Sequence, residues 1–410
     1  MSFLRIAPLA FLISSIAWAE SDVCGNISNY QQIIACAESR SPEVVRAEAS
    51  LKQKNAFKEA SAQLRNPELS FETVTGSVNS GNITETDISL AFPIELGGKR
   101  SARKEVASGE AARAEAELFL AKASVRKKTI LKLLRLRQFY TEQALVEESL
   151  ETFTRLVKQY ESRPLRSPEQ DVSLTVYRIA KGEYGFKKMQ YDEESAELES
   201  YFKVNVGLDL VTLRKSLSSS GAPWPKLNQG RDLAKSPVLA MLEADVSIAK
   251  AELAKAQGDS WPTLNIGPSA KFAKEGGQSY EQFGVNLSMP IPVLNLNGGN
   301  RAVAGASLQS AEVRKSLALR ELQAEKLKLQ KLYQSSVVIL EQTPGGNALD
   351  KNHKRMESHF VKGVVPSSLV IEAHRSLVEF ERTRNERESK AVEAYLDLQI
   401  IDGQPVEWKL

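Results

Sequence analysis

Two cysteines and three histidines are the side chains of this sequence best suited to bind a metal or carry redox chemistry. Cys24 and Cys36 lie twelve residues apart. In an oxidising compartment an even pair at this spacing favours one disulfide, and two free thiols are the alternative. His353, His359 and His374 are separated by six and fifteen residues, so they do not share one helical face as the four-residue zinc motif does. The sequence therefore predicts no metal site and no cofactor.

The 410-residue chain also lacks the motifs that carry enzymatic chemistry. It contains no glycine-rich phosphate loop, no nucleophile elbow and no Cys-x-x-Cys pair. Its 54 Lys and Arg residues against 51 Asp and Glu give a formal net charge of +3, which does not indicate nucleic-acid binding. We therefore expect neither an enzyme nor a nucleic-acid-binding protein.

Residues 1–19 have the three parts of a secretory signal peptide. Arg5 supplies the positive charge, residues 6–16 form the apolar segment, and Ala17-Trp18-Ala19 is a typical cleavage site. The apolar run is too short to span a bilayer, and no longer one follows it in the sequence. The sequence therefore predicts export from the cytoplasm.

The rest of the chain is built from one unit used twice. Ser41-Pro42 returns as Ser236-Pro237, and Asn66-Pro67 returns as Trp261-Pro262, each 195 residues later. A period of this length indicates duplication of a whole half rather than a solenoid. The predicted organisation is a signal peptide at 1–19, an N-terminal segment with the disulfide at 20–40, a first repeat at 41–207, a linker at 208–235, a second repeat at 236–403 and a tail at 404–410.

Each repeat contains two segments in which polar and apolar residues alternate, as in a β-hairpin. The predicted strands are 68–75 and 83–92 in the first repeat, and 263–273 and 280–289 in the second. The alternation places Leu90, Phe92, Leu264, Ile266, Leu287 and Met289 on one face. Glycine pairs follow the hairpins, at Gly97-Gly98 and Gly298-Gly299, where a strand must become a helix and a positive φ is expected.

Long helices follow each hairpin, because long stretches contain no proline and their apolar residues fall three and four apart. We predict helical hairpins at 98–205 and 301–401, reversing at 163–168 and 363–366. The coiled-coil-like seams are Leu133, Leu136, Tyr140, Leu150, Phe153, Val157 and Tyr160, and later Ala391, Ala394, Leu398 and Ile401. The fold class is therefore mainly α with a small β part, in a duplicated unit of one helix, a β-hairpin and a long helical hairpin.

Four strands of about ten residues have the length that a tilted strand needs to cross a bilayer. Four strands cannot close a barrel, for which about eight are the usual minimum. Three copies of the chain would supply twelve strands and remove the open edges. The alternative is a soluble hairpin that packs on the helices.

Several of these segments resemble the TolC-type outer membrane factor family. The resemblance lies in the signal peptide, the duplicated layout, Asn66-Pro67-Glu68-Leu69 and the segment from Phe92 to Arg100. Within that segment the sequence Ile-Glu-Leu-Gly-Gly-Lys-Arg is most similar to the heavy-metal, CzcC-like branch. The resemblance implies a homotrimer with a 12-stranded β-barrel in the outer membrane of a Gram-negative cell, on a periplasmic α-helical barrel. It also implies a periplasmic adaptor and an inner-membrane transporter of the resistance-nodulation-division type as partners.

The same resemblance implies roles for particular residues. The candidate adaptor contacts are at the tips of the helical hairpins: Arg163, Pro164, Ser167, Pro168, Gly363, Val364, Pro366 and Ser367. Asp171 and Glu372 are the candidate carboxylates of a periplasmic gate, since three-fold symmetry would turn each into a ring that favours cations. Lys99, Arg100, Arg103 and Lys104 are expected either to contact lipid phosphates or to form a solvated face.

The functional prediction is a passive export duct of a tripartite efflux pump, for heavy-metal cations or small toxic compounds. An outer membrane duct for type I protein secretion is the alternative within the same class. A periplasmic coiled-coil structural or adaptor protein is the alternative from a different class. The sequence does not decide the cargo, the cognate pump or the resting state of the channel.

Overall fold

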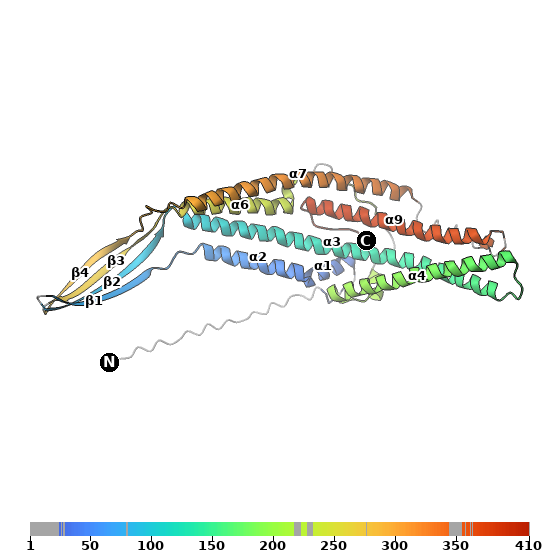
Figure 1. The fold of residues 1–410 in the computed structure, drawn as a ribbon, viewed down its shortest axis with the longest axis horizontal. Helices are drawn as coiled ribbons and strands as arrows, with labels where there is room; N and C mark the ends of the chain where they lie inside the picture. Colours follow the sequence, from blue (N-terminus) through green and yellow to red (C-terminus); the bar gives the residue numbers. More distant parts are fainter. Residues whose placement is uncertain are drawn as a thin grey trace, which may run out of the picture.

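A computed structural model of the chain describes residues 24, 25, 27, 29–78, 81–216, 223–227, 233–275, 277–343, 355, 356, 358–360, 362 and 364–409. The predicted signal peptide lies outside the described residues. The molecule is elongated, with a β-sheet at one end and long helices that run away from it (Figure 1). Among the described residues, no helix combines the length and the apolar character needed to cross a membrane.

The helices and strands alternate in the order that the duplicated sequence predicts. In chain order they are α1 (Tyr30–Arg40), α2 (Pro42–Ser61), β1 (Glu68–Val78), β2 (Gly81–Glu95), α3 (Lys99–Glu161), α4 (Pro168–Asn205), α5 (Leu210–Ser216), the 3-10 helix η1 (Leu233–Lys235), α6 (Pro237–Gly258), β3 (Thr263–Glu275), β4 (Gln278–Ser288), α7 (Gly298–Gln342) and α9 (Ser367–Ile401). Proline stands at the first position of α2, α4 and α6, where the missing N–H leaves no helical hydrogen bond unmade.

The two hairpins join into one antiparallel sheet of order β1-β2-β3-β4, in which β2 pairs with β3. The strands extend a few residues beyond the predicted ranges, apart from β4, which ends one residue earlier, at Ser288. Phe71, Ile88, Ala270 and Phe283 are opposite one another across the four strands. Since side chains directly opposite share a face, this row lies on one side of the sheet.

The register sorts the strand residues into an apolar face and a polar face. The apolar face contains Leu69, Phe71, Ile88, Leu90, Phe92, Ile94, Leu264, Ile266, Phe272, Phe283, Val285 and Leu287. Toward the hairpin turns the same face also carries polar residues: Thr73, Thr84, Thr86, Lys274 and Glu281. The predicted common face of Leu90, Phe92, Leu264, Ile266 and Leu287 is thus confirmed, and Met289 lies just beyond the end of β4. The polar face contains Glu68, Ser70, Glu72, Glu85, Asp87, Ser89, Asn265, Ser269, Lys271, Gln282 and Asn286.

Helix α3 is the central element of the helical part. Its 63 residues extend roughly 95 Å at 1.5 Å per residue. Its first half buries mainly alanines and glycine, so that neighbouring helices approach closely. A Cβ atom at Gly109 would lie 2.6 Å from Ile248 of α6. Near the sheet α2, α6 and α7 accompany α3, whereas α4 and α9 accompany it at the far end (Figure 1).

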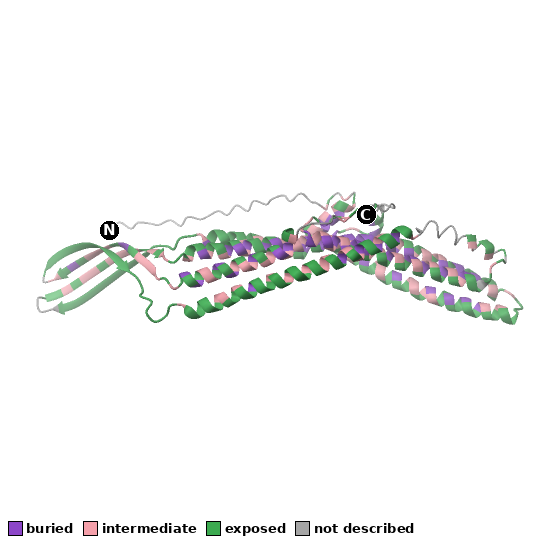
Figure 2. Cartoon of the chain, turned by 90° about the horizontal axis from the view of Figure 1, so that it is seen from above, coloured by how far each residue is buried: buried purple, intermediate pink, exposed green. Residues whose placement is uncertain are grey.

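The main core lies along α3, and buried residues are densest in the middle of the molecule, where several helices meet (Figure 2). The predicted seam residues Leu133, Leu136, Phe153 and Val157 are buried there, and Tyr140, Leu150 and Tyr160 pack partly buried against them. Ala391, Ala394, Leu398 and Ile401 of α9 are buried against α7 in a second cluster. The seam prediction is confirmed.

The first helical hairpin reverses between Glu161 and Pro168, within one or two residues of the predicted position. The second has an interruption that the sequence analysis did not anticipate, because α7 ends at Gln342. Thr343 has extended backbone angles, as expected for the residue before a proline such as Pro344. Most of residues 344–363 lie outside the described residues.

Candidate functional site

The polar face of the sheet carries an excess of negative charge. Carboxylates on this face belong to Glu68, Glu72, Glu85, Asp87 and Glu275, and among the described strand residues Lys271 is the basic residue on the same face. Glu95 has the same parity, but its side chain is buried and its charge is paired with Arg65 and Arg103. Lys271 Nζ donates to Glu85 Oε2 at 2.6 Å. Ser70 and Ser89 are hydrogen-bonded at 2.6 Å between their hydroxyl oxygens. A water-facing surface of this composition attracts cations.

The turn from β2 into α3 needs glycine at both predicted positions. Gly97 and Gly98 have φ values of +72° and +74°, in the left-handed region. A Cβ on Gly97 would lie 2.7 Å from Trp261 Cδ1 and 2.8 Å from the carbonyl oxygen of Gly258. A Cβ on Gly98 would meet no atom within 4 Å. Gly97 is thus required by its conformation and by close packing, and Gly98 by its conformation alone.

The corresponding prediction for Gly298 and Gly299 is wrong. Neither residue has a positive φ, and both lie at the start of α7. The left-handed residue of this turn is Asn297, with φ of +57°. Asparagine tolerates this region, and its side-chain nitrogen donates to the carbonyl oxygen of Ala256 at 2.8 Å. The connection in the second repeat is longer than that in the first, and its left-handed residue lies directly before the glycine pair.

The basic residues after Gly98 hold the sheet to the helices. Arg100 Nη2 donates to the carbonyl oxygen of Ala62 at 2.6 Å, and Arg103 Nε donates to that of Ser61 at 3.1 Å. Both arginines thereby satisfy carbonyl groups at the C-terminal end of α2. Arg103 also pairs with Glu95 through two hydrogen bonds, of 3.0 and 3.1 Å. These two arginines therefore have partners in the protein, and contact of the basic cluster with lipid phosphates stays a prediction.

The first helical tip is ordered by local hydrogen bonds. Ser167 and Gln170 form a capping box at the start of α4, next to Pro168. Arg163 lies over the ring of Tyr160, with 4.6 Å between guanidinium carbon and ring centre. Pro164 is exposed, and the neighbouring Leu165 is 91% exposed. The tip thus presents an apolar side chain on a hydrogen-bonded turn.

The two candidate gate carboxylates are paired with different arginines. Asp171 Oδ1 accepts a hydrogen bond of 2.7 Å from Arg166 Nε. Glu372 is exposed and lies 4.0 Å from Arg375, whose other nitrogen donates to Glu183 at 3.1 Å. Asp171 therefore has a hydrogen-bonded ionic partner within its own tip, whereas the ion pair of Glu372 with Arg375 is longer and is not hydrogen-bonded.

The second tip is described only in part. Val364 and Pro366 are exposed, and the N–H of Val364 donates to the carbonyl oxygen of His359 at 3.0 Å. Ser367 is the first residue of α9. Gly363, one of the candidate adaptor contacts, lies outside the described residues. Both tips lie at the end of the molecule opposite the sheet (Figure 1).

A buried polar cluster near the middle of α3 was missed by the sequence analysis. Glu142 is 1% exposed and accepts hydrogen bonds from Arg135, from Tyr191 of α4 at 2.8 Å and from Asn385 of α9 at 2.8 Å. Burial alone would raise the pKa of Glu142, but the hydrogen bonds from Arg135 and Asn385 outweigh it and lower the pKa. The cluster links α3, α4 and α9 at one position along the length of α3.

Two further buried groups lie on α9. Burial raises the pKa of Glu381, whose surroundings include the carboxylates of Glu142 and Glu388. His374 is buried, and its Nδ1 lies 2.9 Å from Ser149 Oγ beside the ring of Phe153. Among the described residues, no group of three or more His, Cys, Asp or Glu side chains could hold a metal ion. The burial of His374 and its contacts with Ser149 and Phe153 make it part of the helical core.

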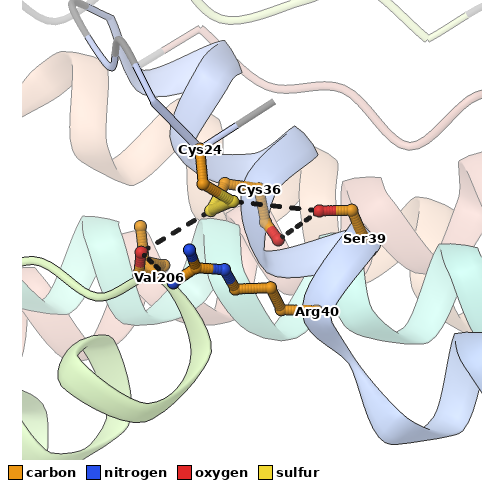
Figure 3. Close-up of a disulfide and its surroundings, with 5 residues drawn as sticks. All are labelled: Cys24, Cys36, Ser39, Arg40 and Val206. Atoms are coloured by element: carbon orange, nitrogen blue, oxygen red, sulfur yellow. Dashed lines mark hydrogen bonds between the residues drawn. A yellow bond between two sulfur atoms is a disulfide. The ribbon is translucent and has the colours of Figure 1, made fainter. Parts of the chain in front are cut away.

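Cys24 and Cys36 are joined by a disulfide with an S–S distance of 1.97 Å (Figure 3). Cys36 Sγ lies 3.6 Å from the carbonyl oxygen of Val206, a packing contact because a disulfide sulfur carries no proton. Arg40 Nη1 donates to the same oxygen at 3.0 Å (Figure 3). The disulfide thus fixes the N-terminal segment to α1 and places both beside the end of α4.

Comparison with known proteins relates this architecture to outer membrane channels, although no family model matches the chain. The cobalt-zinc-cadmium resistance protein CzcC of Cupriavidus metallidurans is 25% identical over 242 residues, which are 57% of this chain and 56% of that protein. The match therefore spans about half the length of this relative.

Solved structures match over nearly the whole chain. The transmembrane channel protein CusC superposes with a TM-score of 0.71 at 15% identity, covering 92% of both chains. The outer membrane channel CmeC of Campylobacter jejuni gives 0.69 at 13% identity, covering 98% of this chain and 94% of that one. The outer membrane protein VceC of Vibrio cholerae gives 0.66 at 17% identity, covering 92% and 97%. The predicted resemblance to TolC-type outer membrane factors, with a relation to CzcC, is confirmed.

Proposed function

We propose that the protein is the outer membrane channel of a tripartite efflux pump, and that three copies form a 12-stranded barrel continued by a helical barrel in the periplasm. The observation that carries this proposal is the open sheet with one exposed apolar face. Phe71, Phe283 and Val285 of that face are each more than two-thirds exposed. A sheet face with several exposed apolar side chains marks contact with a membrane or another protein.

Both edges of the sheet support assembly from several copies. β1 and β4 pair on one side only among the described residues. Unpaired backbone groups at such edges are not tolerated in lipid, so each edge requires a partner strand. Pairing β4 of one copy with β1 of the next closes a ring of twelve strands when three copies join. In this ring the apolar face points to lipid and the polar face to the lumen.

The helical tips are the proposed contact with a periplasmic adaptor. They lie at the far end of the molecule from the sheet, and Leu165 and Val364 expose apolar side chains there. The adaptor would in turn connect the channel to an inner-membrane transporter of the resistance-nodulation-division type. Asp171 and Glu372 lie beside these tips and are the proposed gate. Because Glu372 has the looser ion pair, its carboxylate has the larger influence on a passing cation.

Heavy-metal cations are the proposed cargo. In the proposed barrel the polar face points to the lumen. This face carries carboxylates such as Glu72, Glu85 and Asp87, with Lys271 as its basic residue among the described strand positions. Three copies multiply this excess of negative charge, which favours cations in a water-filled pore. The relative CzcC is named for resistance to cobalt, zinc and cadmium, which supports the same cargo class.

Deleting the gene and scoring growth on zinc, cobalt, cadmium, copper and hydrophobic drugs tests the proposal. We expect lower tolerance to one or more metals, restored by the wild-type gene. Complementation with a variant that lacks the signal peptide is the matched control, because it makes the same chain without export. Sensitivity to hydrophobic drugs with unchanged metal tolerance would contradict the metal cargo. Unchanged tolerance to every compound would contradict the efflux function.

A further inference from the structure

The loop between β4 and α7, residues 289–297 with the sequence Met-Pro-Ile-Pro-Val-Leu-Asn-Leu-Asn, exposes a dense set of apolar side chains. Leu294 is 99% exposed and Val293 is 78% exposed, and Met289, Ile291 and Leu296 are exposed as well. The corresponding connection after β2 is only three residues long, from Leu96 to Gly98. Exposed apolar side chains at this density mark an interaction site. We refer to residues 289–297 as the β4–α7 loop.

Hydrogen bonds hold the end of this loop in place. Ser260 Oγ donates to the carbonyl oxygen of Leu296 at 2.9 Å, and Asn297 Nδ2 donates to that of Ala256 at 2.8 Å. Asn295 accepts a further hydrogen bond of 2.8 Å from the N–H of Asn297. The loop is therefore fixed to the C-terminal end of α6, and its aliphatic side chains remain outside the helical core.

The position of the loop fits the boundary of a membrane. It lies where the sheet meets the helices (Figure 1), and it follows Val285 and Leu287 of the exposed apolar face. Trp261, two residues before β3, is 60% exposed at the same junction. Arg301 is exposed in the first turn of α7. Tryptophan and basic side chains typically flank the apolar band of a membrane protein, where they contact lipid headgroups.

The backbone of the loop does not suit a neighbouring strand as its partner. Pro290 and Pro292 have no N–H group and cannot donate to a β-ladder. The N–H of Val293 donates to the carbonyl oxygen of Ile291 within the loop. The exposed groups that remain are mainly aliphatic side chains, which fit lipid acyl chains without directional contacts.

We propose that the β4–α7 loop is a membrane anchor, which inserts Ile291, Val293 and Leu294 among the acyl chains of the periplasmic leaflet of the outer membrane. This inference rests on the outer membrane location proposed above. The anchor belongs to the second repeat alone, because the first repeat lacks the extra residues. It would fix the depth of the barrel in the bilayer at three points of the trimer.

A fluorescent probe at position 294 tests the anchor. Leu294→Cys is labelled with the polarity-sensitive dye NBD and reconstituted in vesicles of phosphatidylethanolamine and phosphatidylglycerol. The native cysteines do not react while they form the disulfide, so unreduced wild-type protein controls for labelling. Leu165→Cys is the matched variant, because Leu165 is an almost fully exposed leucine at the opposite end of the molecule. Phe283→Cys reports on the apolar face of the sheet.

We expect NBD at position 294 to emit at shorter wavelength than NBD at position 165, and to lose fluorescence when nitroxide-labelled lipid is included. A water-like spectrum at 294, with quenching by lipid at 283, would overturn the anchor and leave the proposed channel intact. A blue-shifted spectrum at 294 that lipid does not quench would also overturn it, because a second copy of the chain would then cover the loop. Absence of lipid quenching at both 283 and 294 would overturn the membrane location itself.

Discussion

Replacing Ile88 by arginine tests the assignment of the two sheet faces. Ile88 is the middle residue of the 15-residue strand β2, which is roughly 50 Å long at about 3.3 Å per residue. A strand tilted by about 40° then rises roughly 38 Å, more than the apolar band of about 25 Å, so its midpoint falls near the centre of the bilayer. Arginine on the lipid side at this depth costs about 2–4 kcal/mol per chain, or about 6–12 kcal/mol per trimer.

The matched control is Ser89→Arg, one residue further along the same strand and on the polar face. Ser89 is opposite Ser70 and Ser269, so an arginine there projects into the proposed lumen among small polar side chains. The measurement is the amount of heat-modifiable trimer in outer membrane fractions, read on gels with and without heating. We expect a large loss of trimer for Ile88→Arg and near wild-type amounts for Ser89→Arg. Equal losses for both variants would refute the assignment of the faces.

Three further predictions concern the junction, the helical core and the gate. Gly98→Ala should cost about 1–2 kcal/mol from its left-handed conformation alone, whereas Gly97→Ala should cost about 2–5 kcal/mol because its Cβ also meets Trp261; thermal denaturation compares the two. Glu381→Gln should raise the melting temperature more at about pH 8 than at about pH 4, because a carboxylate with a raised pKa weakens the fold when ionised and ceases to do so as pH falls. Glu372→Ala should change single-channel conductance or cation selectivity in planar bilayers more than Glu148→Ala does; an unchanged channel would remove Glu372 from the gate.

The faces of the sheet could be predicted from the sequence, because side chains along a strand alternate with a period of two residues. A shift of the register by one residue would reverse the faces. Leu90 and Ile266 were placed on the same side from parity alone, and pairing across β2 and β3 keeps them there. The buried seam of α3 was predictable for the same kind of reason, since helical periodicity persists over many turns.

Contacts between distant segments could not be predicted in this way. Glu142 binds Asn385, which lies 243 residues later, and neither residue type indicates burial by itself. Arg100 and Arg103 carry the composition of a lipid-contacting cluster, yet the carbonyl groups at the end of α2 accept their hydrogen bonds. A hint for Glu142 was present in the sequence, because it falls between apolar seam residues of α3 at helical spacing.

The native mass of the protein extracted from outer membrane fractions tests the central claim most directly. Four strands with one apolar face, whose two outer edges are unpaired among the described residues, require partners, and three copies supply a closed ring of twelve. The account predicts that the chain is recovered from the outer membrane in mild detergent as a particle of three copies. Recovery of a monomer from the soluble periplasmic fraction would contradict it and favour a periplasmic coiled-coil protein instead.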